Sequence, residues 1–512
     1  MSPRGRVAPG TEGREGPVPV APRMEGPILR LALVLVLLLG GVAAGATWWQ
    51  VAEAARLSAD PLDPRRLAAV AVAVPGRILA ADGRVLAEGG GGDRPERRYP
   101  VPEAAPITGY RSALLGTAGL ERTWDAELTG LRPPGGAGEL LRKLRTDPWA
   151  PHDVITSIDL RLQRLGASLL GEDRGAIVIL EPATGRILAL VSSPVAEMGA
   201  LSAGATAREA LDALRDDPAA PLLVRPTQGL YVPGSVFKLV TAAAALESGA
   251  IDASTTFAGQ PRWSREGLVV DGYRIRDAPR ESGLDAPLTL AEALEVSSNV
   301  WFANAALETG PEALAATARR LGIGTSPPFE LPVAAGQLGD GDGLLGGFAD
   351  RAELASTGFG QAEVLVTPLQ VALVAAAIAN GGELMAPRLT DRLVGPDGSV
   401  TEIGGRSLGR VISPGTAGIL RDAMRRAVEG PGAAGLAGGA KVPGVPTAGK
   451  SGTAELGPGE RPHSWFVGFV PADAPRFVVA VVVENGGFGA ERAVPIGGRL
   501  LREALRRVEP GA

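Results

Sequence analysis

The chain has 512 residues, 45% of them hydrophobic, which is enough for two or more domains and a sizeable buried core. Its net charge of −5 gives no indication of a broad basic surface, so we expect no nucleic-acid partner. The absence of cysteine excludes thiol nucleophiles, disulfides and cysteine metal sites, and two histidines, His152 and His463, are too few for a three-histidine zinc site.

The N-terminal segment predicts a membrane anchor. Residues 1–27 are rich in proline, glycine and charge, and we expect a disordered cytoplasmic tail. Residues 28–49 are expected to form one transmembrane helix, because the 19 residues from Leu31 to Trp49 carry no charge and would extend about 30 Å as a helix. Arginines precede this run, so the tail should stay cytoplasmic and the remainder should be extracytoplasmic.

A cleaved signal peptide is the alternative interpretation of this segment. Ala44-Gly45-Ala46 has the small-residue pattern of a cleavage site. The long preceding tail and the paired Trp48 and Trp49, which suit a membrane interface, favour the uncleaved anchor.

Residues 50–150 are expected to form a small, β-rich, membrane-proximal pedestal of the dimerisation-domain type. Within it, residues 75–86 predict two short strands around an Asp82-Gly83 turn. The glycines at 89–92 and the charged residues that follow predict a flexible link. No pattern typical of catalysis occurs before about residue 150.

Residues 151–512 are expected to form a separate α+β domain. Asp159 is a plausible N-cap for a helix that follows a strand at 154–158. The segments that predict two strand pairs are 175–180 with 186–191 and 465–470 with 476–483. A mainly helical block lies between the pairs, and a helix over about 497–508 closes the chain. The economical fold is an antiparallel sheet assembled from both sequence ends and flanked by helices.

One helix of the central block has complete boundary signals. Thr367 is the expected N-cap, Pro368 takes the first helical position, and Gln370 completes a capping box. The helix should end at Asn380-Gly381, where positive φ is easily reached. We expect these residues to be structural.

Lysine is rare in this chain and occurs twice in short motifs beside serine. There are four lysines against 47 arginines. Lys238 closes Ser235-Val236-Phe237-Lys238, and Lys450 opens Lys450-Ser451-Gly452-Thr453. A buried lysine can lose its proton and act as a base, whereas arginine cannot. The two motifs are therefore candidates for chemistry.

Ser235 is expected at the N-terminus of a helix over 236–247, because Pro233-Gly234 breaks the chain before it. Lys238, three residues later, falls on the same face and within reach of the hydroxyl. Such a Ser–Lys pair needs no histidine. Taken alone, Ser235 would be interpreted as an ordinary N-cap serine.

Two further motifs complete the candidate site. Ser297-Ser298-Asn299 lies between two helical patterns and could supply a proton relay and a carboxamide, although this triplet alone is common in loops. In the third motif, Lys450 adds a positive charge near Lys238, the hydroxyls supply donors, and glycine permits close approach of a ligand.

Together the three motifs match a known set. They are separated by 62 residues from Ser235 to Ser297 and by 153 from there to Lys450. The order is that of S-x-x-K, S-D-N and K-T-G in penicillin-binding proteins and class A β-lactamases. The chain resembles a class B penicillin-binding protein of the division-type or penicillin-binding-protein-A-like group. Further matching segments are Gly175–Pro182, Gly358–Gln361 and Trp465–Pro471. Ser298 and Ser451 depart from the pattern, where aspartate and threonine are expected.

This resemblance implies a peptidoglycan D,D-transpeptidase that acts in cell-wall synthesis and cell division. Ser235 would be the nucleophile, Lys238 its base, and Ser297 with Lys450 the route for a proton to the departing D-Ala. The residues implied in substrate binding are Asn299, Ser451, Gly452 and Thr453.

The resemblance also implies partners. These are stem peptides ending in D-Ala-D-Ala, β-lactams that acylate Ser235, the cytoplasmic membrane, and a SEDS-type glycosyltransferase. It requires no cofactor and no metal.

Four alternatives remain to be weighed against this function. A β-lactamase should be a single compact domain with a base for deacylation, and a histidine-dependent hydrolase should show a G-x-S-x-G motif. A non-catalytic penicillin-binding scaffold should have lost a motif residue, and all are present. A D,D-carboxypeptidase differs only in using water as the acyl acceptor, which sequence does not decide.

Overall fold

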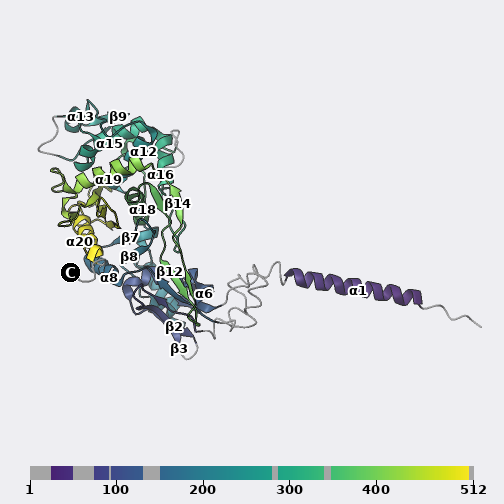
Figure 1. Cartoon of the computed structure of the whole chain (residues 1–512). Helices are drawn as coiled ribbons and strands as arrows, with labels where there is room; N and C mark the ends of the chain where they lie inside the picture. The colour runs from purple at the N-terminus through teal and green to yellow at the C-terminus, as the bar shows by residue number, and fades with distance from the viewer. Residues whose placement is uncertain are drawn as a thin grey trace, which may run out of the picture. The chain divides into compact units, whose positions relative to one another are not determined.

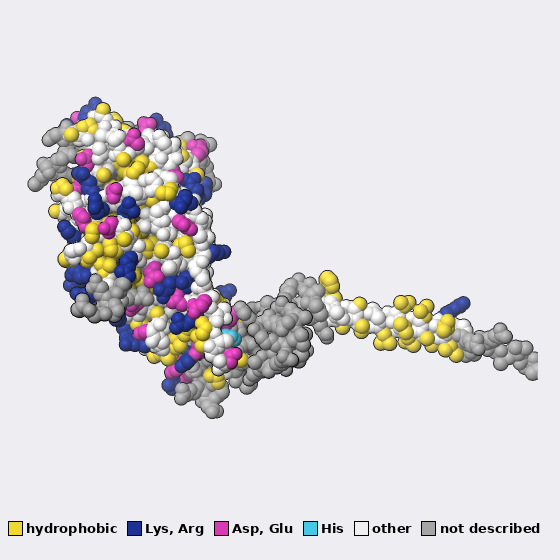
Figure 2. Space-filling view, viewed as in Figure 1, with side chains coloured by type: hydrophobic (Ala, Val, Ile, Leu, Met, Phe, Trp, Pro, Cys, Tyr) yellow, Lys and Arg dark blue, Asp and Glu magenta, His cyan; other side chains and the backbone are white. Residues whose placement is uncertain are grey.

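The computed structural model describes residues 25–49, 74–91, 94–130, 150–279, 286–339 and 347–506. It divides into two compact units, 1–67 with 133–139, and 68–132 with 140–512. The first unit contains helix α1, Glu25–Thr47 (Figure 1). Among the described residues, this is the one helix long and apolar enough to cross a membrane, over Ile28–Thr47. Figure 2 shows hydrophobic side chains along its length. The tail expected at 1–27 lies almost entirely outside the described residues.

The second unit is built on a five-stranded antiparallel sheet in the order β15-β16-β17-β7-β8. Its strands are β7 (Gly175–Leu180), β8 (Ile187–Ser193), β15 (Ala448–Ala454), β16 (His463–Val470) and β17 (Phe477–Val483). Both expected strand pairs are present, and β17 pairs with β7 to join the two ends of the sequence. The predicted α+β fold, an antiparallel sheet flanked by helices, is confirmed.

The two faces of this sheet belong to two hydrophobic cores because side chains alternate along each strand. In β17, Val478, Ala480 and Val482 point into the core that includes helix α18. The intervening Val479, Val481 and Val483 point into the core that includes helices α8 and α20. Since both faces are covered, the strands consist of nearly continuous apolar residues.

The helices of the described residues, in chain order after α1, are α4 (Ala105–Thr108), α5 (Gly119–Thr123), α6 (Asp125–Thr129), α8 (Leu160–Leu170), α9 (Met198–Ser202), α10 (Ala207–Asp216), α11 (Arg225–Gln228), α12 (Lys238–Ser248), α13 (Gln260–Glu266), α14 (Leu290–Glu295), α15 (Asn299–Thr309), α16 (Pro311–Arg320), α17 (Arg351–Thr357), α18 (Pro368–Ala379), α19 (Pro414–Glu429) and α20 (Ala493–Arg506). Short 3₁₀ turns are η2 (Pro102–Ala104), η3 (Gly204–Thr206), η4 (Gly234–Phe237) and η5 (Gly438–Ala440).

Two of the predicted helix starts are confirmed and two are wrong. The helix expected over 236–247 is α12, which begins at Lys238 because Ser235 lies in the 3₁₀ turn η4. Asp159 caps α8 by accepting a hydrogen bond from the Arg161 N–H, and α18 has the predicted capping box. The closing helix α20 begins at Ala493 rather than near 497. Gly497 lies inside this helix. A β-carbon at this position would be 2.2 Å from the Phe466 ring, so the glycine permits close packing of the helix on the sheet and does not mark a helix start.

A second sheet has six strands in the order β13-β12-β6-β1-β2-β3. Its strands are β1 (Ile78–Leu79), β2 (Val85–Gly91), β3 (Arg94–Arg98), β6 (Asp153–Thr156), β12 (Thr390–Val394) and β13 (Val400–Glu402). Three two-stranded ribbons complete the described strands, β4 (Arg111–Ser112) with β5 (Gly116–Thr117), β9 (Leu268–Val270) with β10 (Tyr273–Ile275), and β11 (Glu383–Met385) with β14 (Ser407–Arg410). The six-stranded sheet extends across the domain boundary expected at 150, which stays a prediction.

The flexible link expected over 89–98 is wrong for its described residues, because 89–91 belong to β2 and 94–98 form β3, which pairs with it. One charged side chain of this segment, Arg97, is buried in the protein. The Arg97 Nε donates to Glu121 at 2.6 Å, and the Arg111 Nε donates to the other oxygen of the same carboxylate at 2.9 Å. Glu121 is fully buried. The charge of Arg97 therefore serves a buried ion pair and does not mark a flexible segment.

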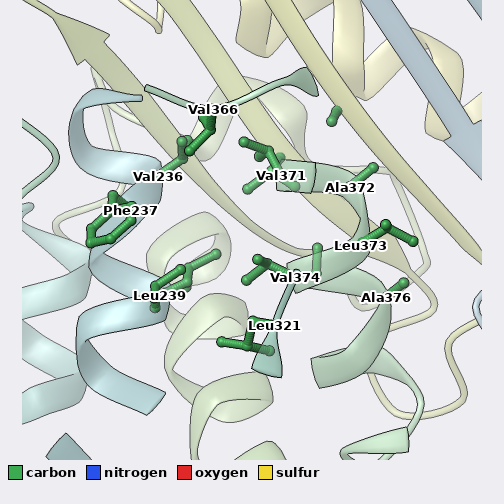
Figure 3. Close-up of a cluster of buried hydrophobic side chains, with 14 of the residues drawn as sticks. Val236, Phe237, Leu239, Leu321, Val366, Val371, Ala372, Leu373, Val374 and Ala376 are labelled. Carbon is green, nitrogen blue, oxygen red and sulfur yellow. The ribbon is translucent and has the colours of Figure 1, made fainter. Parts of the chain in front are cut away.

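A hydrophobic cluster supports the helix that follows Ser235. Figure 3 shows Val236, Phe237 and Leu239 facing Val371 and Val374 of α18. A small apolar cavity among these residues has room for about one water molecule (≈ 10 Å³). The turn and helix after Ser235 are thus fixed by apolar packing against α18.

Candidate active site

The Ser235 turn is held by close backbone packing at two glycines. Gly234 has φ +55°, and its N–H donates to the Gly360 carbonyl at 2.8 Å. A β-carbon on Gly234 would lie 2.5 Å from the Thr453 carbonyl oxygen, and one on Gly360 would lie 1.9 Å from the Gly234 carbonyl oxygen. Three backbone segments therefore stack without room for side chains, which places Ser235 beside β15.

Lys238 is the first residue of α12 and is fully buried. Its Nζ lies 2.9 Å from Ser235 Oγ and 3.1 Å from Ser297 Oγ. It also donates to the Ser297 carbonyl oxygen at 2.7 Å and to Asn299 Oδ1 at 2.8 Å. The spacing of three residues thus brings the amine and the hydroxyl into direct contact across η4.

The chemistry of these neighbours suits a base. Carbonyl and carboxamide oxygens can only accept hydrogen bonds, whereas a hydroxyl can donate or accept. An uncharged amine could give its two N–H groups to Ser297 O and Asn299 Oδ1. Its lone pair would then be available to the Ser235 hydroxyl proton.

Ser297 lies at the centre of the cluster in a rarely occupied conformation. Its φ is +58°, which is uncommon for a residue with a side chain. Its Oγ lies 3.0 Å from Ser235 Oγ and accepts from the Lys450 Nζ at 2.9 Å. Strain of this kind persists only where surrounding contacts hold it, and it is common at functional sites.

The third motif lies on β15, the outermost strand of the sheet order. Lys450 is 1% exposed, and besides Ser297 it donates to the Ser451 carbonyl oxygen at 2.9 Å. Gly452 packs against Trp465, where a β-carbon would be 2.9 Å from that side chain. The Thr453 hydroxyl accepts from the Gly489 N–H at 3.2 Å. An edge strand presents backbone groups with which an extended peptide can pair.

The structure thus brings all three motifs together. Ser235, Lys238, Ser297, Asn299 and Lys450 are linked by direct contacts, and the β15 residues adjoin the Ser235 turn.

The turn before Ser235 is also fixed to the sheet by a buried carboxylate. The Tyr231 hydroxyl and the Arg225 Nε each donate to Glu484 at 2.8 Å. Burial acts to raise the pKa of Glu484, but the hydrogen bonds from Arg225 and Tyr231 and the nearby guanidinium charges outweigh it and hold that pKa below its ordinary value. The Tyr231 ring also packs edge-on against His463.

Both histidines have structural contacts. His463 is the first residue of β16, where its Nδ1 accepts from the Asn485 N–H at 3.0 Å. Burial lowers the pKa of His463. His152 lies just before β6, and its backbone N–H donates to the Glu127 carbonyl at 2.9 Å.

Sequence reasoning missed Asp277. Its carboxylate accepts from the Asn299 N–H at 2.5 Å and from the Ser298 hydroxyl at 2.9 Å. It is 22 residues away from Asn299 and belongs to no motif, so no local pattern marks it.

Comparison with known proteins agrees with the motifs. The family described as penicillin binding protein transpeptidase domain matches residues 175–502. The chain is 36% identical over 509 residues to peptidoglycan D,D-transpeptidase PbpA of Mycolicibacterium smegmatis, covering 94% of this chain and 99% of that protein. Peptidoglycan D,D-transpeptidase MrdA of Acinetobacter baumannii is 28% identical over 74% of this chain and 59% of its own length.

Among solved structures, the penicillin G acyl-enzyme complex of penicillin-binding protein A from M. tuberculosis matches with a TM-score of 0.72 at 34% identity. The match covers 85% of this chain and 100% of that chain. The crystal structure of PBPA from Mycobacterium tuberculosis matches with a TM-score of 0.70 at 35% identity, covering 84% of this chain and 98% of that chain. The family resemblance inferred from the motifs is confirmed.

Proposed function

The chain belongs to the penicillin-binding protein transpeptidase family, and from this premise we propose that it is a peptidoglycan D,D-transpeptidase working through an acyl-enzyme on Ser235. Its relatives are named for this activity, and one was solved as a penicillin G acyl-enzyme. The observation that carries the proposal is the 2.9 Å contact between Ser235 Oγ and the buried Lys238 Nζ.

Acylation begins when Ser235 Oγ attacks the carbonyl carbon of the penultimate D-Ala and its proton passes to the Lys238 amine. The new oxyanion is stabilised by the backbone N–H groups of Ser235 and Thr453, each worth about 3–4 kcal/mol. The close packing of Gly234 on the Thr453 backbone supports this pairing of donors.

Collapse of the tetrahedral intermediate breaks the bond to the terminal D-Ala nitrogen and leaves an ester on Ser235. The departing amine must gain a proton. Ser297 Oγ supplies it and is resupplied from Lys238, which holds the proton taken from Ser235, while Lys450 stays charged beside the same hydroxyl. No net proton is consumed, because the proton taken from Ser235 ends on the released D-Ala.

Substrate binding uses the remaining motif residues. Asn299 binds an amide of the stem peptide, and Ser451 and Thr453 bind the terminal carboxylate, whose charge is balanced by Lys450. Gly452 leaves room for the peptide beside β15. An amine from a neighbouring strand then attacks the ester and gives a proton to Lys238. The bond between the acyl carbon and Ser235 Oγ breaks, Ser235 recovers that proton, and the crosslinking amide remains. β-Lactams acylate Ser235 and remain attached.

The location proposed for this activity is the outer side of the cytoplasmic membrane. The apolar Ile28–Thr47 segment would be the anchor, and the arginines before it favour a cytoplasmic N-terminus. The glycan strands would be polymerised by a SEDS-type glycosyltransferase contacting the anchor and the membrane-proximal region.

The test is acylation of a matched pair of variants. We expect Lys238→Arg to abolish labelling by fluorescent penicillin, because a guanidinium cannot act as the base, while circular dichroism shows a folded protein. Lys441→Arg, a change at an exposed lysine, should label as the natural chain does.

Intact-mass analysis with peptide mapping should place the adduct of the natural chain on Ser235. Absence of that adduct, or full labelling of Lys238→Arg, would overturn the proposal. Incubation with a stem pentapeptide and an amine acceptor separates crosslinking from release of free acid, the product of a carboxypeptidase.

A further inference from the structure

We propose that Asp277 is a positioning residue for acylation of Ser235, because its carboxylate fixes the turn that holds Ser297 and Asn299 against Lys238. This inference rests on the proposed transpeptidase function. It adds to that function a residue from the segment after β10, outside the three motifs.

Asp277 binds the start of α15 at three consecutive residues. Its Oδ1 accepts from the Asn299 N–H at 2.5 Å and from the Val300 N–H at 3.1 Å, and its Oδ2 accepts from the Ser298 hydroxyl at 2.9 Å. The first N–H groups of a helix have no partner within the helix, and a negative charge is favoured there. Where the S-D-N pattern has aspartate, this chain has Ser298, whose hydroxyl meets a carboxylate from elsewhere in the sequence.

The residue before Asp277 fixes the Asn299 side chain. The Asn299 Nδ2 donates to the Arg276 carbonyl oxygen at 3.0 Å, while its Oδ1 accepts from the Lys238 Nζ at 2.8 Å. A carboxamide held on both sides cannot rotate without losing both bonds. Residues 276 and 277 therefore set the backbone and the side chain of Asn299 together.

Asp277 is itself anchored by a short hydrogen-bond chain. The Ser264 hydroxyl donates to its Oδ2 at 2.7 Å, and the Gln260 Nε2 donates to that hydroxyl at 2.8 Å. Gln260 is fully buried, and its Oε1 accepts from the Leu288 N–H at 3.0 Å. The carboxylate thus links α13 to the segments on either side of α14, which makes it a rigid support.

The strain at Ser297 explains why such support would matter for the reaction. The turn keeps Ser297 at φ +58°, with its carbonyl oxygen 2.7 Å from the Lys238 Nζ. Without Asp277, the turn can relax toward an unstrained conformation and carry Ser297 and Asn299 away from the amine. A displacement of about 1 Å in a reacting group can cost about 100-fold in rate.

The experiment compares Asp277→Ala, Asp277→Asn and Glu266→Ala in the full chain, with fluorescent penicillin as the probe. Glu266 is an exposed carboxylate on α13 and serves as the matched control. Saturation kinetics separate the acylation rate constant from the apparent dissociation constant, and active-site titration counts the folded sites. We expect Asp277→Ala to lower the acylation rate constant about 10- to 100-fold with little change in the dissociation constant. Asp277→Asn keeps an oxygen for the α15 N–H groups and should recover most of the rate, and Glu266→Ala should match the natural chain.

Several outcomes would overturn the inference. These are an unchanged rate constant in Asp277→Ala, an equal fall in Glu266→Ala, or a loss explained wholly by fewer titratable sites. Should Asp277→Ala fail to fold, Ser264→Ala decides, because it loosens the carboxylate through one bond and should lower the same rate constant by a smaller factor. Failure of the natural chain to acylate Ser235 would instead refute the proposed function and is seen before any variant is compared.

Discussion

The cluster around Glu121 and the cluster around Lys238 are both buried, but the first is built on arginine and the second on lysine. Glu121 is bound by the guanidinium groups of Arg97 and Arg111, which are planar, permanently charged and matched to a carboxylate. The Lys238 amine instead contacts two hydroxyls and two amide oxygens. A guanidinium holds its charge in place, whereas an amine among hydroxyls can exchange protons. The first arrangement suits a fixed structure and the second suits a reaction.

The strongest way to break this comparison is to remove the Glu121 carboxylate. Glu121→Ala leaves two buried guanidinium groups without their partner, and we expect the free energy of unfolding to fall by about 3–5 kcal/mol. Denaturant unfolding measures this loss. The protein that remains folded should acylate at the natural rate, and a slower rate constant per folded site would show that the two clusters are not separate in function.

Lys450→Met tests the second cluster with a change of similar size and shape. We expect acylation by fluorescent penicillin to slow about 100-fold, because Ser297 and the substrate carboxylate lose a positive neighbour. The exposed Lys441→Met is its control. If both variants label equally fast, the positive charge of Lys450 has no part in the reaction.

A pH titration sharpens the comparison at Glu484, a carboxylate between arginine and tyrosine. Its pKa is lowered in the folded protein, so its contribution to stability is present above the ordinary pKa of about 4.3 and is lost as pH falls through the folded value. The free energy of unfolding should therefore decline on acidification below about pH 4. Glu484→Gln should show a shallower decline, and an identical pH dependence of the two proteins would contradict the expectation.

The smallest effect is expected at the cap of α18. Thr367→Ala removes the hydroxyl that accepts from the Gln370 N–H, and we expect a loss of about 1 kcal/mol in the free energy of unfolding. Calorimetry measures the shift against Thr401→Ala on exposed β13. The acylation rate should not change, since the Thr367–Gln370 capping box stabilises the fold and does not contact Ser235.

Local patterns predicted the elements whose signals lie within a few residues. The strand pairs follow from apolar runs, α18 from its capping box, and the Ser235–Lys238 contact from the geometry of one helical turn. The meeting of Ser297 and Lys450 with this pair was expected only through the family resemblance, because it depends on segments far apart in the chain. The contacts of Asp277 with the start of α15 were predicted neither by a local pattern nor by the family resemblance.

The errors have physical causes of the same kind. The glycines and charged residues around Arg97 predict a flexible link because nothing near Arg97 in the sequence reveals Glu121, its buried partner. The sequence predicts a helix start near Gly497 because the Phe466 ring, which requires a glycine there, comes from a distant strand. In both cases the deciding contact is tertiary.

The stacked glycines at 234 and 360 have a consequence for how this enzyme could evolve under drug selection. Any larger residue at either position would force apart the backbone segments that position Ser235. Substitutions at these two positions are therefore not available as a route to resistance. Changes that spare the wall-building reaction while slowing antibiotic capture should therefore arise around the rim of the site, where residues can vary without disturbing that stack.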